Sequence, residues 1–130
     1  IDNLNRNCHQ EIIKTFHKIK IIKSILSSYN FKFKFFILPT IFNANKELSV
    51  MEKKIIKKIK IKHPIIFEVF DLGYRMLSDK TGDDNAVINM NNVYCELVQS
   101  VFLDFCHCST IGLRRLASTS IDHSTIYRQN

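Results

Sequence analysis

The chain has 130 residues, the usual size of one domain, with 45% hydrophobic and 24% charged residues and only 3 Gly and 2 Pro. This composition excludes a disordered polar chain and a Gly- or Pro-rich fibrous repeat, and it suffices for one hydrophobic core. The formal net charge is +7, but residues 1–63 carry 14 basic and 4 acidic side chains (+10), whereas residues 64–130 carry 5 basic and 8 acidic ones (−3). Such a basic half favours nucleic acid, an anionic membrane surface or an acidic protein as partner, or it follows from AT-rich base composition alone.

The basic half, residues 1–63, contains two predicted helices and one short extended element. Apolar residues at a spacing of three or four predict an amphipathic helix over residues 11–26, with lysines on its other face. Alternation of Phe and Lys over residues 31–35 predicts a short β element near residues 31–37. Asn43 or Asn45 is expected to cap the next helix. Its inner stripe is predicted to contain Leu48, Met51, Ile55 and Ile59.

The second half, residues 64–130, is predicted to be helical as well. Pro64 suits a first helical position, and a third helix is expected to run to residue 77, followed by a polar loop over residues 78–85. Val93, Leu97, Val101 and Phe105 repeat at intervals of four and predict a fourth helix. Two short helices are expected at residues 113–118 and from residue 122 onward. The predicted fold is therefore a mainly α bundle of five to six helices in one compact domain.

Residues 113–128 are typical of a helix-turn-helix. Leu113, Leu116 and Ala117 would pack inward from the first helix, Thr119 and Ser120 would form the turn, and Ile121 and Ile126 would fill the gap between the helices. Asp122 would cap the second helix. The outer face of this pair would offer polar and basic side chains to DNA, namely Arg114, Arg115, His123, Ser124, Thr125 and Arg128.

The run Ile121-Asp122-His123-Ser124-Thr125-Ile126-Tyr127-Arg128 resembles the recognition-helix segment of bacterial insertion-sequence transposases of the DDE class. Leu113-Arg114-Arg115-Leu116 resembles the first helix of their helix-turn-helix, and the apolar stretch from Leu97 stands where that family has a supporting helix, so that the resemblance covers residues 93–128. The turn is shorter than the family's and lacks its Gly, and Gln129 stands where an aromatic residue is usual. The family's three catalytic acids follow this motif, so the resemblance transfers no catalytic residue to this chain.

The remaining polar residues do not predict catalysis or a cofactor. Cys106-His107-Cys108 and His123 offer possible zinc ligands, but their spacing is not that of a zinc knuckle, and no metal is expected. Cys8, Cys95, Cys106 and Cys108 make a poor disulfide framework and are expected to be reduced. Because residues 1–10 lack the apolar core of a signal peptide and no apolar run approaches a membrane span, an intracellular location is expected.

Two functions follow as hypotheses. The first is a DNA-binding helical module, a truncated transposase-like fragment without enzymatic activity, in which the C-terminal helix pair contacts double-stranded DNA and Lys57 and Lys58 hold phosphates. The second is a non-enzymatic interaction module of viral or parasite type that binds a partner protein through an apolar groove. A third interpretation of the basic helices is purely structural: their isoleucines lie in the core and their lysines are solvated.

Overall fold

The computed structural model describes residues 2–81 and 86–125. Four helices and two short strands follow one another along this part of the chain: α1 (Asp2–Ser28), β1 (Phe35–Ile37), α2 (Val50–Lys62), α3 (Pro64–Thr81), β2 (Val87–Asn89) and α4 (Thr110–Thr125). The fold is mainly helical, as predicted, but the described residues form four helices rather than five to six. None of these helices is both long and apolar enough to cross a bilayer.

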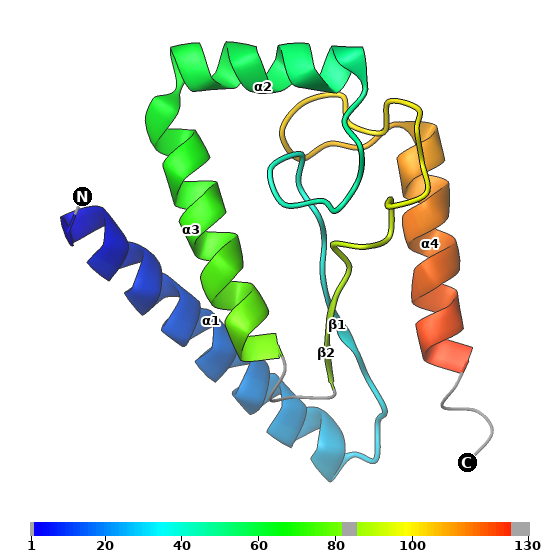
Figure 1. Ribbon diagram of the computed structural model, residues 1–130. Coiled ribbons are helices and arrows are strands. Elements are labelled where there is room, and N and C mark those ends of the chain that lie inside the picture. Colours follow the sequence, from blue (N-terminus) through cyan, green and yellow to red (C-terminus); the bar gives the residue numbers. More distant parts are fainter. Residues whose placement is uncertain (1, 82–85, 126–130) are drawn as a thin grey trace.

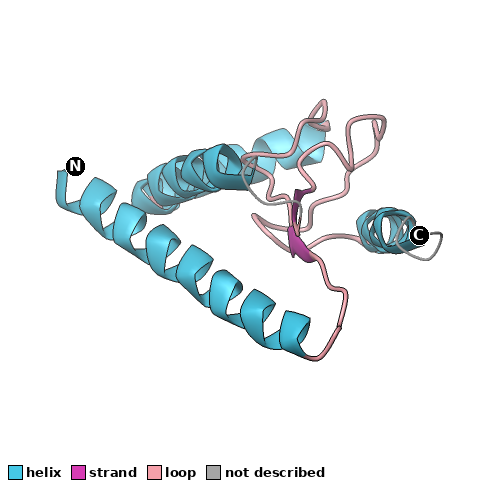
Figure 2. Ribbon diagram, turned by 90° about the horizontal axis from the view of Figure 1, so that it is seen from below, coloured by secondary structure: helices cyan, strands magenta, loops and turns pink. Residues whose placement is uncertain are grey.

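The helices surround a small parallel sheet. β1 pairs with β2 in the register Phe35↔Val87, Phe36↔Ile88 and Ile37↔Asn89. Helix α3 contacts both α1 and α2; α2 lies across one end of α3, and α1 passes the other end (Figure 1). Seen from below, the strands lie between the α1–α3 pair and α4 (Figure 2). The predicted β element near residues 31–37 is thus confirmed, whereas its partner β2 was not predicted.

Local signals explain where the helices of the basic half end and begin. Asn30 adopts a left-handed conformation (φ 59°), which Asn tolerates, and the Phe31 N–H donates back to the Leu26 carbonyl at 3.0 Å, so that α1 ends there. Ser49, rather than Asn43 or Asn45, caps α2: its hydroxyl accepts from the Glu52 N–H, and the Glu52 carboxylate accepts from the Ser49 N–H. This is a capping box.

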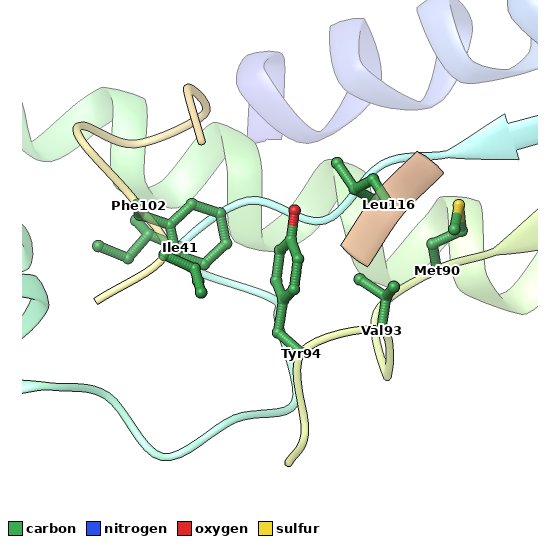
Figure 3. Packing of buried hydrophobic residues seen from close by; sticks show 7 residues of the cluster. Ile41, Met90, Val93, Tyr94, Phe102 and Leu116 are labelled. Carbon is green, nitrogen blue, oxygen red and sulfur yellow. The ribbon is translucent and has the colours of Figure 1, made fainter. Parts of the chain in front are cut away.

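The hydrophobic core is built mainly by irregular chain. Tyr94 lies between two groups of apolar side chains (Figure 3). The described core cluster takes one residue from the segment after β1, five from the chain after β2 and one from α4: Ile41, Met90, Val93, Tyr94, Val101, Phe102 and Leu116. Side-chain hydrogen bonds between asparagines join the segment after β1 to the chain after β2. Asn43 Nδ2 donates to Asn91 Oδ1 and Asn45 Nδ2 to Asn92 Oδ1, each at 2.6 Å. Backbone groups that form no helix or sheet are thereby kept in a fixed arrangement.

The predicted helix over residues 93–105 is wrong, because this segment consists of turns and loop. Its repeat of four matches an α-helix, and its apolar residues are indeed in or against the core. The backbone, however, is paired differently: the Val101 and Phe102 N–H groups both donate to the Glu52 carboxylate of α2. A distant acceptor thus replaces the helical hydrogen bonds that the local pattern predicts.

The predicted turn at Thr119 and Ser120 is also wrong, since α4 runs without a break through both residues. Their hydroxyls donate to the Arg115 and Leu116 carbonyls at 3.0 and 2.8 Å, one turn back within the same helix. Both residues therefore fit a helix interior without ending it.

The residues predicted to be buried on α4 and α2 also differ in part from those that are buried. On α4, Leu116 is buried as expected, but Leu113, Ala117 and Ile121 are exposed. On α2, Met51 is 61% exposed, and the fully buried residue of the helix is Glu52. On α2 the correction concerns Met51 alone, because Leu48 and Ile55 of the predicted stripe do pack against the core, and the most buried position of the helix belongs to a polar residue, Glu52.

Candidate functional site

Helix α4 holds most of the predicted DNA-contacting residues, and the structure assigns several of them to the fold. Arg115 Nε donates to the Val93 carbonyl at 3.2 Å, and its Nη2 pairs with Glu96 at 3.1 Å, so this side chain connects α4 to the loop after β2. The His123 ring lies 6.4 Å from the Phe36 ring of β1. Arg114 is exposed. Arg114 and Arg115 are thus both exposed, but Arg115 has partners within the fold, whereas Arg114 has none among the contacts described.

The remaining predicted contacts of the C-terminal segment lie at or beyond residue 125, where the described part of the chain ends. Ser124 and Thr125 belong to the last turn of α4, and Arg128 lies outside the described residues. The segment 121–128, on which the resemblance to transposases rests, is thus described only in part, and that resemblance stays a prediction.

Helix α2 presents a continuous basic surface. Its six lysines, all exposed, are Lys53, Lys54, Lys57, Lys58, Lys60 and Lys62. Lys60 Nζ lies 4.2 Å from the centroid of the Phe67 ring, and within the described ranges no carboxylate pairs with the other five. The single acid of the helix, Glu52, is turned into the core. The outer face therefore carries six positive charges without an opposing one, and it includes the predicted contacts Lys57 and Lys58.

An apolar groove lies within this basic surface. It is open to solvent, measures about 460 Å³ and is lined by three apolar residues and three lysines of α2: Met51, Ile55, Ile61, Lys54, Lys57 and Lys58. Met51 and Ile61 are 61% and 72% exposed. Ile55 is half-buried and also packs against the core, so Met51 and Ile61 supply the uncovered apolar surface that lies beside the lysines.

The groove depends on how Glu52 orients α2. Its Oε1 accepts from the Val101 and Phe102 N–H groups at 2.9 and 3.2 Å, and its Oε2 accepts from Lys46 Nζ at 2.6 Å and the Ser49 N–H at 2.8 Å. Burial by itself raises the Glu52 pKa, but these donors outweigh burial and lower the pKa to about 2. Because its two oxygens accept from four donors, the Glu52 carboxylate has a structural role in this arrangement.

A second polar cluster forms in the loop before α4. His107 Nδ1 lies 2.6 Å from Asp104 Oδ2 and 3.7 Å from Cys106 Sγ, and one donor atom from each residue lies within 4.8 Å of the other two. Burial by itself raises the Asp104 pKa, but hydrogen bonds from the His107 and Cys106 N–H groups and from the His107 ring lower it to about 2. Partial burial and the neighbouring Asp104 charge raise the pKa of the Cys106 thiol.

Cys108 and His123, which the sequence offered as possible zinc ligands beside Cys106 and His107, do not join the cluster, although Cys108 Sγ lies 3.9 Å from the Cys106 carbonyl oxygen. Cys108 Sγ is 3.1 Å from the Tyr94 hydroxyl, and burial raises the pKa of both groups. His123 belongs to α4 and lies thirteen positions after the first residue of that helix, about 20 Å along the helix axis. The structure therefore keeps Cys106 and His107 together, leaves Cys108 and His123 out of the cluster, and adds Asp104, which the sequence analysis did not consider.

The three residues that the sequence analysis missed, Ser49, Glu52 and Asp104, have a local signal. Ser49 and Glu52 follow the Ser-x-x-Glu pattern of a capping box, and Asp104 precedes Cys106 and His107 closely enough for a turn to unite them. What no local signal gives is the second role of Glu52, as an acceptor for amides 49 and 50 residues away. Comparison with known proteins gives no match: no family model, no curated protein and no solved structure matches the chain.

Proposed function

We propose that the protein is an interaction module that binds an acidic, amphipathic helix of a partner protein in the groove on α2. The observation that carries this proposal is the coincidence of uncovered apolar side chains and unopposed lysines on one helix face. Helix-in-groove recognition uses apolar anchors one turn apart with charged residues beside them. Met51, Ile55 and Ile61 would accept the anchors, and Lys54, Lys57 and Lys58 would face the partner's carboxylates.

The apolar part of the groove favours a protein partner over nucleic acid. Phosphates would gain from the lysines but would leave Met51 and Ile61 as exposed as they are now. An acidic amphipathic helix uses both features, because it buries apolar surface and supplies charges of the opposite sign. An anionic membrane surface also offers both, so it forms a separate arm of the test below.

Double-stranded DNA is the second candidate, and a specific observation favours it. Five α2 lysines have no carboxylate partner within the described ranges, and residues four apart on a helix lie about 6 Å apart along its axis, which allows several phosphate contacts in a row. Support for base reading by α4 is weaker, because Arg115 and His123 already have partners in the fold. The lysines would therefore contact the phosphate backbone of the DNA, and binding would not depend on the base sequence.

The test measures fluorescence anisotropy of three labelled probes with the full chain. The first is a synthetic 14-residue helix with Leu on one face and Glu on the other, together with a scrambled peptide of the same composition. The second is a 16-base-pair duplex of random sequence, and the third is a vesicle of phosphatidylcholine and phosphatidylglycerol. We expect saturable binding of the amphipathic peptide and at least tenfold weaker binding of the scrambled one and of the other probes.

Two double variants identify the surface. Met51→Ser/Ile61→Ser should weaken peptide binding about tenfold or more, and Lys57→Glu/Lys58→Glu should weaken it by a similar factor that shrinks as salt rises. Lys18→Glu/Lys20→Glu on α1 changes the net charge equally and should leave binding unchanged. Preference for the duplex, with loss in the lysine variant alone, would replace this proposal with DNA binding; preference for the vesicles would replace it with a membrane role.

A further inference from the structure

The loop between the core and α4 holds its polar side chains in a fixed arrangement. Phe102 and Cys108 form an antiparallel bridge, and the Leu103 N–H donates to the His107 carbonyl at 2.9 Å, so that the chain between them is a closed hairpin. Asp104 Oδ1 accepts from the Cys106 and His107 N–H groups at 2.9 and 2.8 Å. The carboxylate is therefore held by the backbone through one oxygen, and its other oxygen, Oδ2, faces the His107 ring.

Three different donor atoms converge at this point. One ligand atom from each of Asp104, Cys106 and His107 lies within 4.8 Å of the other two, and His107 Nδ1 is 2.6 Å from Asp104 Oδ2 and 3.7 Å from Cys106 Sγ. Bonds of about 2.0 Å to N and O and about 2.3 Å to S place the donors of a tetrahedral zinc site about 3.3–3.6 Å apart. The sulfur–nitrogen distance already fits this geometry. The 2.6 Å nitrogen–oxygen hydrogen bond would open by less than about 1 Å when a cation replaces its proton.

The same geometry argues against a nucleophilic cysteine. A Cys–His–Asp relay needs one ring nitrogen for the thiol and the other for the carboxylate. Here both Cys106 Sγ and Asp104 Oδ2 approach the same nitrogen, Nδ1 of His107. A shared nitrogen cannot pass a proton from one group to the other, whereas donors that surround one point are what a metal ion requires.

We propose that Asp104, Cys106 and His107 bind one Zn²⁺ ion, with a fourth position open to water or to a ligand from a partner. The mixed O, N and S donors suit zinc and not the all-oxygen shells of Ca²⁺ and Mg²⁺. Binding exchanges the Cys106 thiol proton for a zinc–sulfur bond and releases that proton to solvent. The proton between His107 Nδ1 and Asp104 moves to Nε2 of the same ring or to solvent, and no group changes oxidation state. This site departs from the expectation of no metal and is independent of the α2 groove.

The experiment titrates Co²⁺ into the metal-free, fully reduced full chain and records absorption. Thiolate ligation of Co²⁺ gives a charge-transfer band in the near ultraviolet, and tetrahedral geometry gives strong visible bands. We expect both to saturate at one Co²⁺ per chain and to disappear when Zn²⁺ is added. Absence of the charge-transfer band in the wild-type protein would overturn the proposal.

Three ligand variants and three controls locate the ion. Cys106→Ser, His107→Gln and Asp104→Asn should each weaken Co²⁺ binding at least tenfold; Asn at position 104 keeps an oxygen for the two backbone N–H groups, and circular dichroism checks that the fold is intact. Cys108→Ser is the matched control, because its thiol faces Tyr94, and it should retain the bands. Cys8→Ser and Cys95→Ser should retain them too. Bands that survive in any ligand variant, or that disappear in a control, would contradict this site.

Discussion

Two regions of this protein bury apolar residues in opposite ways. Helix α1 has a regular amphipathic pattern, and Ile12 of its predicted stripe is 8% exposed, but Ile22 of the same stripe is 42% exposed, and Ile13, Ile21 and Ile25 are between 47% and 52% exposed. The irregular chain after β2 contains Tyr94 and Val101 at 0% and Phe102 at 1%. Helical periodicity therefore marks part of the buried apolar surface, but the most completely buried apolar residues lie outside helices. What distinguishes the second region is a set of side-chain acceptors that satisfy its backbone, so that a chain without regular structure can be buried.

The largest loss of stability is expected when the irregular core loses the carboxylate that accepts from its backbone N–H groups. Glu52→Ala leaves the Lys46 ammonium and the Val101 and Phe102 N–H groups without their partner. We expect a loss of about 5 kcal/mol in the free energy of unfolding, the upper end for breaking a buried ion pair. Urea denaturation followed by circular dichroism measures it. Glu47→Ala, at an exposed position of the same segment, is the control, and an equal loss in both variants would contradict the role of Glu52.

The apolar half of the same core gives the next largest effect. Phe102 is 1% exposed and packs edge-on against Tyr94, with ring centroids 5.5 Å apart. Phe102→Ala should cost about 3–4 kcal/mol through lost burial and a cavity. Its neighbour Leu103 is 67% exposed, so Leu103→Ala should change stability by less than about 0.5 kcal/mol. If the two variants melted alike in urea, the loop would not be the core.

Acid should loosen the core through the same carboxylate. The folded-state pKa of Glu52 is lowered to about 2 from its ordinary value of 4.5, so its stabilisation is complete above pH 4.5 and is lost as the pH falls towards 2. This difference corresponds to about 3 kcal/mol. Urea midpoints measured from pH 6 to pH 2 should therefore fall, and Glu52→Gln should flatten the fall. A residual slope is expected from Asp104, whose pKa is lowered in the same range.

The smallest expected effect tests the connection between the loop core and α4. Arg115→Ala removes the contacts with the Val93 carbonyl and Glu96 and should cost about 1 kcal/mol. Arg114→Ala, one position earlier and exposed, should be neutral within about 0.5 kcal/mol. Thermal denaturation of both variants decides between these roles. A reversed order would indicate that Arg115 does not hold α4 to the loop.

The sequence predicted those elements whose signals are local. Helix α3, from Pro64, and a β element near residues 31–37 are confirmed, and the helix expected over residues 11–26 lies within a longer α1 that begins at Asp2. The two failures have different causes, one long-range and one local. The loop at residues 93–105 gave up helical pairing for Glu52, and α4 continued through Thr119 and Ser120 because their hydroxyls bond within the helix.

The candidate sites divide in the same way. The lysines of α2, including Lys57 and Lys58, could be read from the sequence because charge is a property of each residue. The apolar groove among them could not, since Met51 was predicted to face inward and is exposed only because Glu52 occupies that side. The cluster of Asp104, Cys106 and His107 likewise needs the closed hairpin that brings its three donors together.

By itself, the sequence determined the helical class, the basic first half and the residues able to form caps, because these depend on neighbours a few positions apart. Only the tertiary structure decided which faces are buried, since a buried N–H needs an acceptor wherever the fold can supply one. Here that acceptor is Glu52, 49 residues from Val101 in the chain, and its position sets both the loop core and the exposed face of α2.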